Sequence, residues 1–411
     1  MSKTKKILMS IFGVGAAITT AVATSCGPTG GGSEDGKLVA VVMTDPENPI
    51  WVKAKSAAEA ALEKQGLPTV ANIIKSQSDQ NSWIQTQLDA HSTIKYLLLA
   101  PTDTGAATAV QNAKERNVTV IAYDKLIPAI SDNYNWYVSF DNERVGELQG
   151  LAFLSGIYKY QEPGEGKDNI FDDETTMLEW VKAHKLAEKG IFYTVGGDPA
   201  DNNARLFYDP AVALIKKAQE IDPNLVNGIL NDSFSIAGTP DWNYALAKNR
   251  IATELEKLKV EDKDNVVGIL VPNDGMANVM VEALADAEIN NVILTGLDAN
   301  ETAYNHIKNG KQMITIDKPD SRTTEIASLM IKALYEKSKE AGKDVDLTPE
   351  EMEAAIKKYA PDLKYKFRIV STDPAYQVTS ADGKSKKFIK SVIIEPVIIT
   401  KDNVEQIKPG V

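Results

Sequence analysis

Strand-like and helix-like segments alternate along the chain in two separate runs, and this alternation restricts the fold more than any other feature. The first run has apolar strands at 38–43, 70–74, 94–100 and 118–123, with helices at 50–65, 80–91 and 104–117. The second has strands at 191–195, 225–230, 266–271, 292–297 and 312–316, with helices at 203–220, 241–259, 274–287 and 300–309. Short apolar strands that alternate with helices form parallel sheets covered on both faces. The sequence therefore predicts two similar α/β lobes.

Size and charge agree with a two-lobed globular protein. The chain has 411 residues, of which 43% are hydrophobic, which is enough for a core in each lobe. The net charge is −12, and the positive charge is scattered along the chain rather than gathered in stripes. A groove that follows a phosphate backbone is therefore not expected, and nucleic acid is excluded as a partner. Polar stretches at 158–189 and 339–366 are expected to be insertions, and 391–400 resembles a strand.

The N-terminus has the pattern of a bacterial lipoprotein signal. Three lysines in the first six residues precede an apolar run at 7–23, and small residues stand directly before Cys26, the only cysteine. We expect a signal peptide at 1–25, lipidation of Cys26 and a flexible Gly/Ser-rich tether at 26–37, which would hold the body close to the outer face of the cell membrane. Ala23 occupies the third position before the cysteine, where Leu is more common. An uncleaved membrane anchor and a plain secreted chain remain the alternatives.

The sequence gives little support for metal or redox chemistry. Its three histidines, His91, His184 and His306, are far apart, and a single cysteine forms neither a zinc spacing nor an intrachain disulfide. An all-carboxylate metal site stays open. No cofactor is expected.

Polar and aromatic side chains recur where the expected strands end. Ligands of parallel α/β sheets bind outside the carboxyl ends of the strands, so these side chains are candidates for one shared site. Each single Asp or Asn has a second explanation, because helix N-caps prefer the same residue types. N-capping does not explain the neighbouring lysines. The candidates are Trp51, Asp124, Lys125, Asp201, Asn203, Phe234, Asn273, Asp298 and Lys318.

These residue types suit a sugar. Asp and Asn side chains each offer two polar atoms that bridge adjacent hydroxyls, and Lys donates to oxygens. An aromatic ring such as that of Trp51 or Phe234 can lie against the C–H face of a sugar ring. The combination predicts a monosaccharide site.

One strand end, TVGGDPADNNARLF at 194–207, is unusually rich in such residues. We expect its two glycines to allow a tight turn and Asp201 and Asn203 to face the ligand. Asn202 is a candidate helix cap, and Arg205 is either a surface charge or the partner of a carboxylate.

Six motifs carry a family resemblance in sequence order. They are AYDKLI (122–127), YVSFDNERVGELQG (137–150), GGDPADNNARLF (196–207), VPNDGMA (271–277), TGLDAN (295–300) and DKP (317–319). Together they resemble the xylose-binding branch of the type I periplasmic sugar-binding proteins of ABC transporters, over most of residues 38–400. The resemblance implies two Rossmann-like lobes with parallel sheets, joined by a three-strand hinge, with a sugar clasped between them.

The resemblance also implies roles, partners and boundaries. Asp124, Lys125, Asp201, Asn203, Asn273, Asp298 and Lys318 match the family's sugar ligands, and Trp51 matches its stacking aromatic. A permease would receive the sugar, and the protein would be a monomer without enzymatic activity. We place the first lobe at 38–140 plus about 319–345, and the second at 141–317 plus about 366–400.

Two departures from the xylose-binding pattern leave the identity of the sugar open. Lys125 stands where that branch has Arg, which loses a bidentate donor, and Ile50 replaces another Arg. Another aldose or polyol is therefore possible.

Three other functions are alternatives for a chain of this pattern. A glycosidase could use paired carboxylates such as Asp198 and Asp201, but no nucleophile or phosphate-binding motif accompanies them. A repressor of this fold would need a helix-turn-helix in place of residues 1–37. A nucleoside- or signal-binding lipoprotein of the same fold is the runner-up, and it would need more aromatic residues than Trp51 and Phe234.

Overall fold

The computed structural model describes residues 36–47, 49–161, 169–228, 233–380 and 382–407. The expected signal peptide, Cys26 and most of the tether lie outside these residues. Within the described part, no helix is long and apolar enough to cross a membrane.

In the described chain, the first lobe is built on a seven-stranded sheet in the order β11-β14-β5-β4-β3-β1-β2. All neighbouring strands are parallel except the edge pair β11 and β14. The strands are β1 (Val39–Met43), β2 (Thr69–Ile73), β3 (Tyr96–Leu99), β4 (Thr119–Tyr123), β5 (Tyr134–Phe140), β11 (Phe367–Val370) and β14 (Lys390–Ile394).

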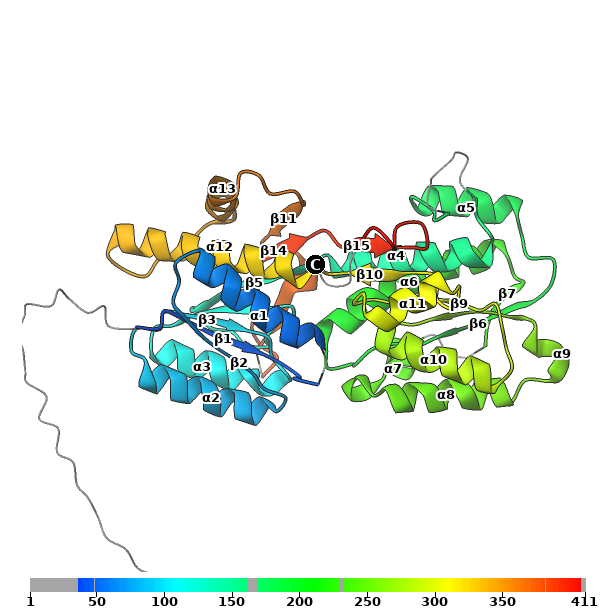
Figure 1. The fold of residues 1–411 in the computed structure, drawn as a ribbon, viewed down its shortest axis with the longest axis horizontal. Helices are drawn as coiled ribbons and strands as arrows, with labels where there is room; N and C mark the ends of the chain where they lie inside the picture. Colours follow the sequence, from blue (N-terminus) through cyan, green and yellow to red (C-terminus); the bar gives the residue numbers. More distant parts are fainter. Residues whose placement is uncertain (1–35, 48, 162–168, 229–232, 381, 408–411) are drawn as a thin grey trace, which may run out of the picture. The chain divides into compact units, whose positions relative to one another are not determined.

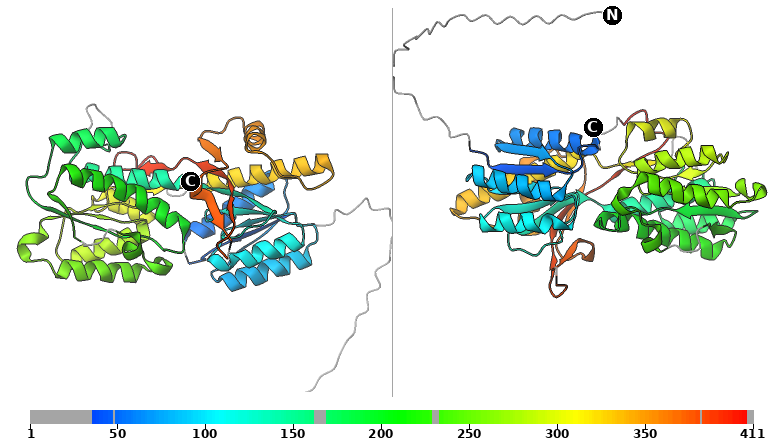
Figure 2. Two further views of the ribbon diagram at one scale, coloured as in Figure 1. Left: turned by 180° about the vertical axis from the view of Figure 1, so that it is seen from behind. Right: turned by 90° about the horizontal axis from the view of Figure 1, so that it is seen from below.

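Helices cover both faces of this sheet, as the continuous apolar strands require. Side chains alternate between the two faces of a strand, so Val39 and Val41 pack with α1, α12 and α13, whereas Ala40 and Val42 pack with α2 and α3. Figures 1 and 2 show α1 and α12 side by side on one face. The helices are α1 (Pro49–Lys64), α2 (Gln77–Ala90), α3 (Ala107–Glu115), α12 (Asp320–Ala341) and α13 (Pro349–Tyr359), with short 3-10 turns η1 (Thr104–Ala106) and η3 (Pro374–Tyr376).

The described part of the second lobe has a parallel sheet in the order β7-β6-β8-β9. Helices α4 and α6 pack together with core residues on one face, and α8 and α10 pack on the other. The strands are β6 (Gly190–Thr194), β7 (Leu225–Asn227), β8 (Val266–Leu270) and β9 (Ile293–Leu294). The helices are α4 (Asn142–Ile157), α5 (Glu174–Ala183), α6 (Asn202–Ile221), α7 (Phe234–Ala237), η2 (Pro240–Trp242), α8 (Tyr244–Glu256), α9 (Val260–Lys263), α10 (Asp274–Asp286) and α11 (Glu301–Lys308).

Two small antiparallel pairs complete the described fold. The segment 312–316, expected as one more parallel strand, instead gives β10 (Thr315–Asp317), which pairs antiparallel with β15 (Val397–Ile399). Strands β12 (Gln377–Thr379) and β13 (Lys386–Phe388) form a hairpin. The two expected insertions contain α5 and α13.

The described chain passes between the lobes three times, at residue 141, at 318–319 and at 395–396. This confirms the expected two-lobed α/β architecture with its three connections. The expected boundary at 366–400 is wrong, because β14 pairs with β5 and β11 pairs with β14 in the first sheet, and only β15 joins the second lobe. Residues 366–394 therefore extend the first lobe.

A buried glutamine holds the strand ends together in each lobe. In the first lobe, the Gln80 amide nitrogen lies 3.2 Å from the carbonyl oxygens of Met43, Ile74 and Ala100, which end three neighbouring strands. In the second, Gln149 donates to the carbonyls of Pro272 and Gly296 at 3.1 Å. Such bonds give the carbonyls at the strand ends a side-chain donor, and they fix the loops that follow.

Candidate functional site

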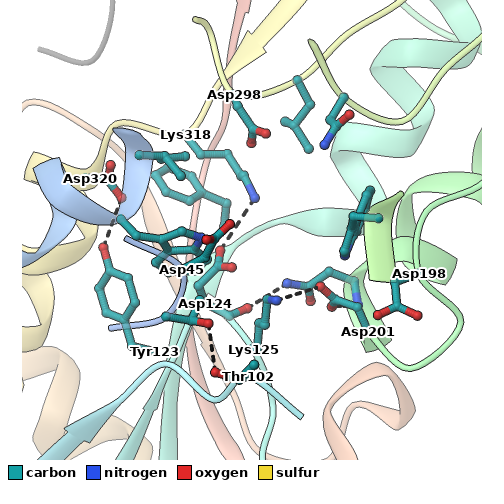
Figure 3. A pocket seen from close by; sticks show the side chains of 18 of the residues that line it. Asp45, Thr102, Tyr123, Asp124, Lys125, Asp198, Asp201, Asp298, Lys318 and Asp320 are labelled. Carbon is teal, nitrogen blue, oxygen red and sulfur yellow. Dashed lines mark hydrogen bonds and ion pairs between the residues drawn. The ribbon is translucent and has the colours of Figure 1, made fainter. Parts of the chain in front are cut away.

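A cavity of about 420 Å³ is lined by residues of both lobes, a size typical of small-molecule sites (Figure 3). Eight of the nine candidate residues line it. From the first lobe and the connections come Trp51, Asp124, Lys125 and Lys318, and from the second come Asp201, Asn203, Asn273 and Asp298.

Lys125 and Asp201 connect the lobes across this cavity. The Lys125 Nζ lies 3.4 Å from an Asp201 carboxylate oxygen, and both side chains are largely buried. Burial alone would lower the pKa of Lys125, but the carboxylates of Asp201 and Asp124 outweigh it, so the pKa is raised and the lysine stays charged.

Lys318 enters the same cavity from the second connection between the lobes. Its Nζ lies 3.5 Å from Asp124 Oδ1 and 5.3 Å from the centre of the Phe207 ring. Burial opposes its charge, yet Asp124 and Asp298 raise the pKa above its usual value. Both lysines are thus charged donors that point into the cavity (Figure 3).

Asp124 has a left-handed backbone, with φ of 60°, and its carbonyl is held by several donors. Asn203 Nδ2 donates to this carbonyl at 2.7 Å, and Ser139 donates to it at 3.2 Å. The Asn203 oxygen accepts a bond of 3.0 Å from Asn142. Asn203 is therefore brought to the cavity as expected, but in this structure its amide braces the Asp124 loop across the lobes.

Two loops that follow strands of the second lobe supply further polar groups. Asn273 caps α10 by accepting from the Met276 amide at 3.0 Å, and it lines the cavity at the same time. Asp298 has φ of 92° and turns its carboxylate into the cavity, where burial raises its pKa and Lys318 lowers it.

The 194–207 segment differs in detail from the expectation. Asp201, not Asn202, caps α6, because its carboxylate accepts from the Asn203 amide at 3.0 Å. The Arg205 Nε lies 2.9 Å from Asp209 Oδ2, so Arg205 is the partner of a carboxylate, one of its two expected roles.

The second of the two glycines makes room for an aromatic wall. A Cβ on Gly197 would overlap the ring of Trp242, which lines the cavity. The glycine is therefore needed for this close approach.

Phe234 lies outside the cavity. It is 8% exposed and packs in the core of the second lobe, with its ring 5.4 Å from that of Tyr208. The expectation that it contacts the ligand is not supported, because α7 turns the ring toward α6. Trp242 and Tyr244, which sequence reasoning missed, line the cavity instead.

A family model described as "Periplasmic binding protein domain" matches residues 39–344, about three quarters of the chain. The chain belongs to this family. It is also 31% identical over 419 residues to the 46 kDa surface antigen of Mesomycoplasma hyopneumoniae strain 232, with 95% of each chain covered.

The chain is also similar to more distant relatives and to solved structures. The D-xylose-binding periplasmic protein of Haemophilus influenzae is 26% identical over 223 residues, or 54% of each chain. An ABC transporter solute-binding protein from Clostridium phytofermentans with bound β-D-glucose superposes with a TM-score of 0.67 at 22% identity, covering 90% of this chain and 96% of its own. At 22% identity, this similarity is evidence for the fold alone.

Other lining residues carried weaker sequence signals. Asp320 and Thr323 follow the DKP motif at the start of α12, and Tyr123 ends β4 and donates to Asp320 at 3.2 Å. The available signal was their position, because Tyr123 lies within the motif AYDKLI and the other two closely follow DKP. Among the described residues, no group of three or more His, Cys, Asp or Glu side chains is arranged to hold a metal ion.

Proposed function

We propose that this protein captures a monosaccharide, a xylose-like aldose, between its two lobes and delivers it to the permease of an ABC transporter. The observation that carries the proposal is the convergence of Asp124, Lys125, Asp201, Asp298 and Lys318 on one cavity. Charged acceptors and donors from both lobes match the alternating donor and acceptor capacity of sugar hydroxyls. The names of the sugar-binding relatives support the same ligand class.

Binding is expected to favour a closed form of the protein. A ligand that touches both lobes stabilises closure by its differential affinity for the closed state. Rotation about the three connections would change the distance between Lys125 and Asp201. It would also bring the remaining hydrogen-bond donors of Lys125 and acceptors of Asp201 onto the sugar. The closed form is then the state that the permease recognises.

A thermal-shift screen of aldopentoses, aldohexoses and nucleosides tests the ligand class. A ligand at 100 times its Kd is expected to stabilise the fold by about 2.7 kcal/mol. Small-angle scattering with the best ligand should show compaction. No stabilisation by any monosaccharide would overturn the sugar assignment, and binding without compaction would overturn the closure mechanism.

One observation keeps the nucleoside alternative in the screen. A flat base needs aromatic faces, and Trp242 and Tyr244 supply two in addition to Trp51. A nucleoside that binds more tightly than every sugar would replace the first assignment with this one.

We further propose that the mature chain is a monomer whose Cys26 carries the lipid that anchors it to the outer face of the membrane. The support is the arrangement of basic, apolar and small residues before that cysteine. Intact-mass analysis of the membrane-bound chain should show an N-terminus at Cys26 that carries acyl groups. A membrane-bound chain that still contains residues 1–25, or that carries no acyl group, would contradict lipid anchoring at Cys26.

A further inference from the structure

The cavity contains more carboxylates than cations. Among its described lining residues there are seven aspartates and three lysines. The acids are Asp45, Asp124, Asp198, Asp201, Asp241, Asp298 and Asp320, and the bases are Lys75, Lys125 and Lys318. An anionic sugar would have to enter this negative field.

All three lysines already have carboxylate partners. Lys125 pairs with Asp201 and Lys318 with Asp124, while Lys75 pairs with Glu47, which is not a lining residue. Each of these three lysines is therefore already in an ion pair, and the remaining acids must be stabilised in other ways.

Asp298 differs from the other unpaired acids. Asp320 accepts a hydrogen bond of 3.2 Å from the Tyr123 hydroxyl. Asp45 and Asp198 accept hydrogen bonds from backbone amides, and Asp241 is exposed to solvent. In the described part of the chain, no hydrogen bond or ion pair reaches the Asp298 carboxylate, which is half-buried and points into the cavity (Figure 3). Such a group costs free energy unless a ligand supplies a donor.

A ligand cation suits this carboxylate best. Carboxylates only accept hydrogen bonds, and an ammonium group only donates them. An amine beside Asp298 would therefore supply the missing donor and add a positive charge to those of Lys318 and Lys125, which only partly offset the burial of this carboxylate. A hydroxyl in the same place would supply the donor alone.

Resting on the sugar-binding function proposed above, we infer that the cavity takes amine-bearing aldoses in preference to the corresponding neutral aldoses, that Asp298 receives the amine, and that acidic sugars are excluded. The raised pKa of Asp298 agrees with this assignment, because burial leaves its charge incompletely compensated.

Calorimetric titration of the full extracytoplasmic chain at about pH 6, where alkyl amines are protonated, tests the inference. The probes are D-glucose, its 2-, 3- and 6-amino-deoxy derivatives, and D-glucuronate. A sugar hydroxyl already makes a charge-assisted bond with a carboxylate, and an ammonium group adds the attraction of a second charge. At least one amino sugar should therefore bind about tenfold more tightly than glucose, which corresponds to about 1.4 kcal/mol. Glucuronate should show no measurable binding.

Two variants assign the effect to its residue. Asp298→Asn keeps the shape but removes the charge, and it should bring the amino-sugar and glucose affinities to within about twofold of each other. Asp172→Asn removes a charge from an exposed position outside the described lining and should leave the preference unchanged.

The outcomes separate this inference from the function on which it rests. If glucose binds and no amino sugar binds more tightly, or if glucuronate binds as well as glucose, the inference is wrong and the sugar-binding function stands. If the preference survives Asp298→Asn, Asp298 is not its origin. If none of these probes and no sugar in the wider screen binds, the proposed function itself fails.

Discussion

The Lys125 ammonium of the first lobe lies 3.4 Å from the Asp201 carboxylate of the second, so an ion pair connects the lobes at the cavity. Asp201 also caps α6 through the Asn203 amide. One carboxylate therefore serves both the stability of a helix and the contact between the lobes.

These two roles of Asp201 can be separated by two substitutions. Asp201→Asn retains an oxygen that caps α6 but loses the ion pair, whereas Asp201→Ala loses both. Because Asn and Asp are equally good caps, only the alanine variant should lose about 1 kcal/mol of cap stability in denaturant unfolding. Both variants should bind sugar at least about tenfold more weakly, since a charged hydrogen bond contributes about 1.5–3 kcal/mol. Equal unfolding free energies for the two variants would contradict the capping role.

Gly197 should be intolerant of even a methyl group. In Gly197→Ala, the new Cβ would push the Trp242 ring away from its place in the cavity wall. Overpacking of this kind costs about 1–3 kcal/mol, and it should also weaken sugar binding.

A double variant provides the control for this contact. Gly197→Ala combined with Trp242→Leu removes the overlap, so the loss of stability should be smaller than the sum of the two single losses. Additive losses would show that the ring does not oppose the methyl group.

The sequence placed most of the cavity correctly, and the reason is geometric. Asp124, Asn273 and Asp298 follow strand ends, and the carboxyl ends of parallel strands meet at one edge of each sheet. Their positions in the sequence therefore sufficed to predict their convergence.

Phe234 and Trp242 show where that reasoning stops. Both lie on short helical turns after β7, and their directions depend on packing against Tyr208 and Gly197, which local sequence does not encode. The assignment of β14 failed for a similar reason, because strand order is a tertiary property.

Asp274 should make stability depend on pH. It is fully buried and accepts hydrogen bonds of 2.9–3.0 Å from the Gln312 side chain, the Thr315 hydroxyl and the Asn300 amide. Burial raises its pKa from 3.8 to about 8. The folded state therefore holds an extra proton between these values, and stability falls as the pH rises through that window.

A comparison with Asp274→Asn isolates this contribution. From about pH 5 to about pH 8, the unfolding free energy of the wild type should fall relative to the variant by at least about 1.4 kcal/mol, the equivalent of one pKa unit. The same substitution at the exposed Asp172 should give no such trend. A difference between the wild type and the Asp274 variant that does not change with pH would show that Asp274 ionises normally in the folded protein.

Ligand binding should be visible in tryptophan fluorescence, and two of the five tryptophans should report it. Trp51 and Trp242 line the cavity, and Lys125 lies 5.8 Å from the centre of the Trp51 ring, so a sugar that engages Lys125 changes the surroundings of that indole. Trp51→Phe should remove a large part of the emission change and weaken binding by a few-fold to about tenfold, because less aromatic surface is buried. Trp83→Phe, outside the described lining, should alter neither quantity. An emission change that persists in the Trp51→Phe, Trp242→Phe double variant would mean that the ligand binds elsewhere.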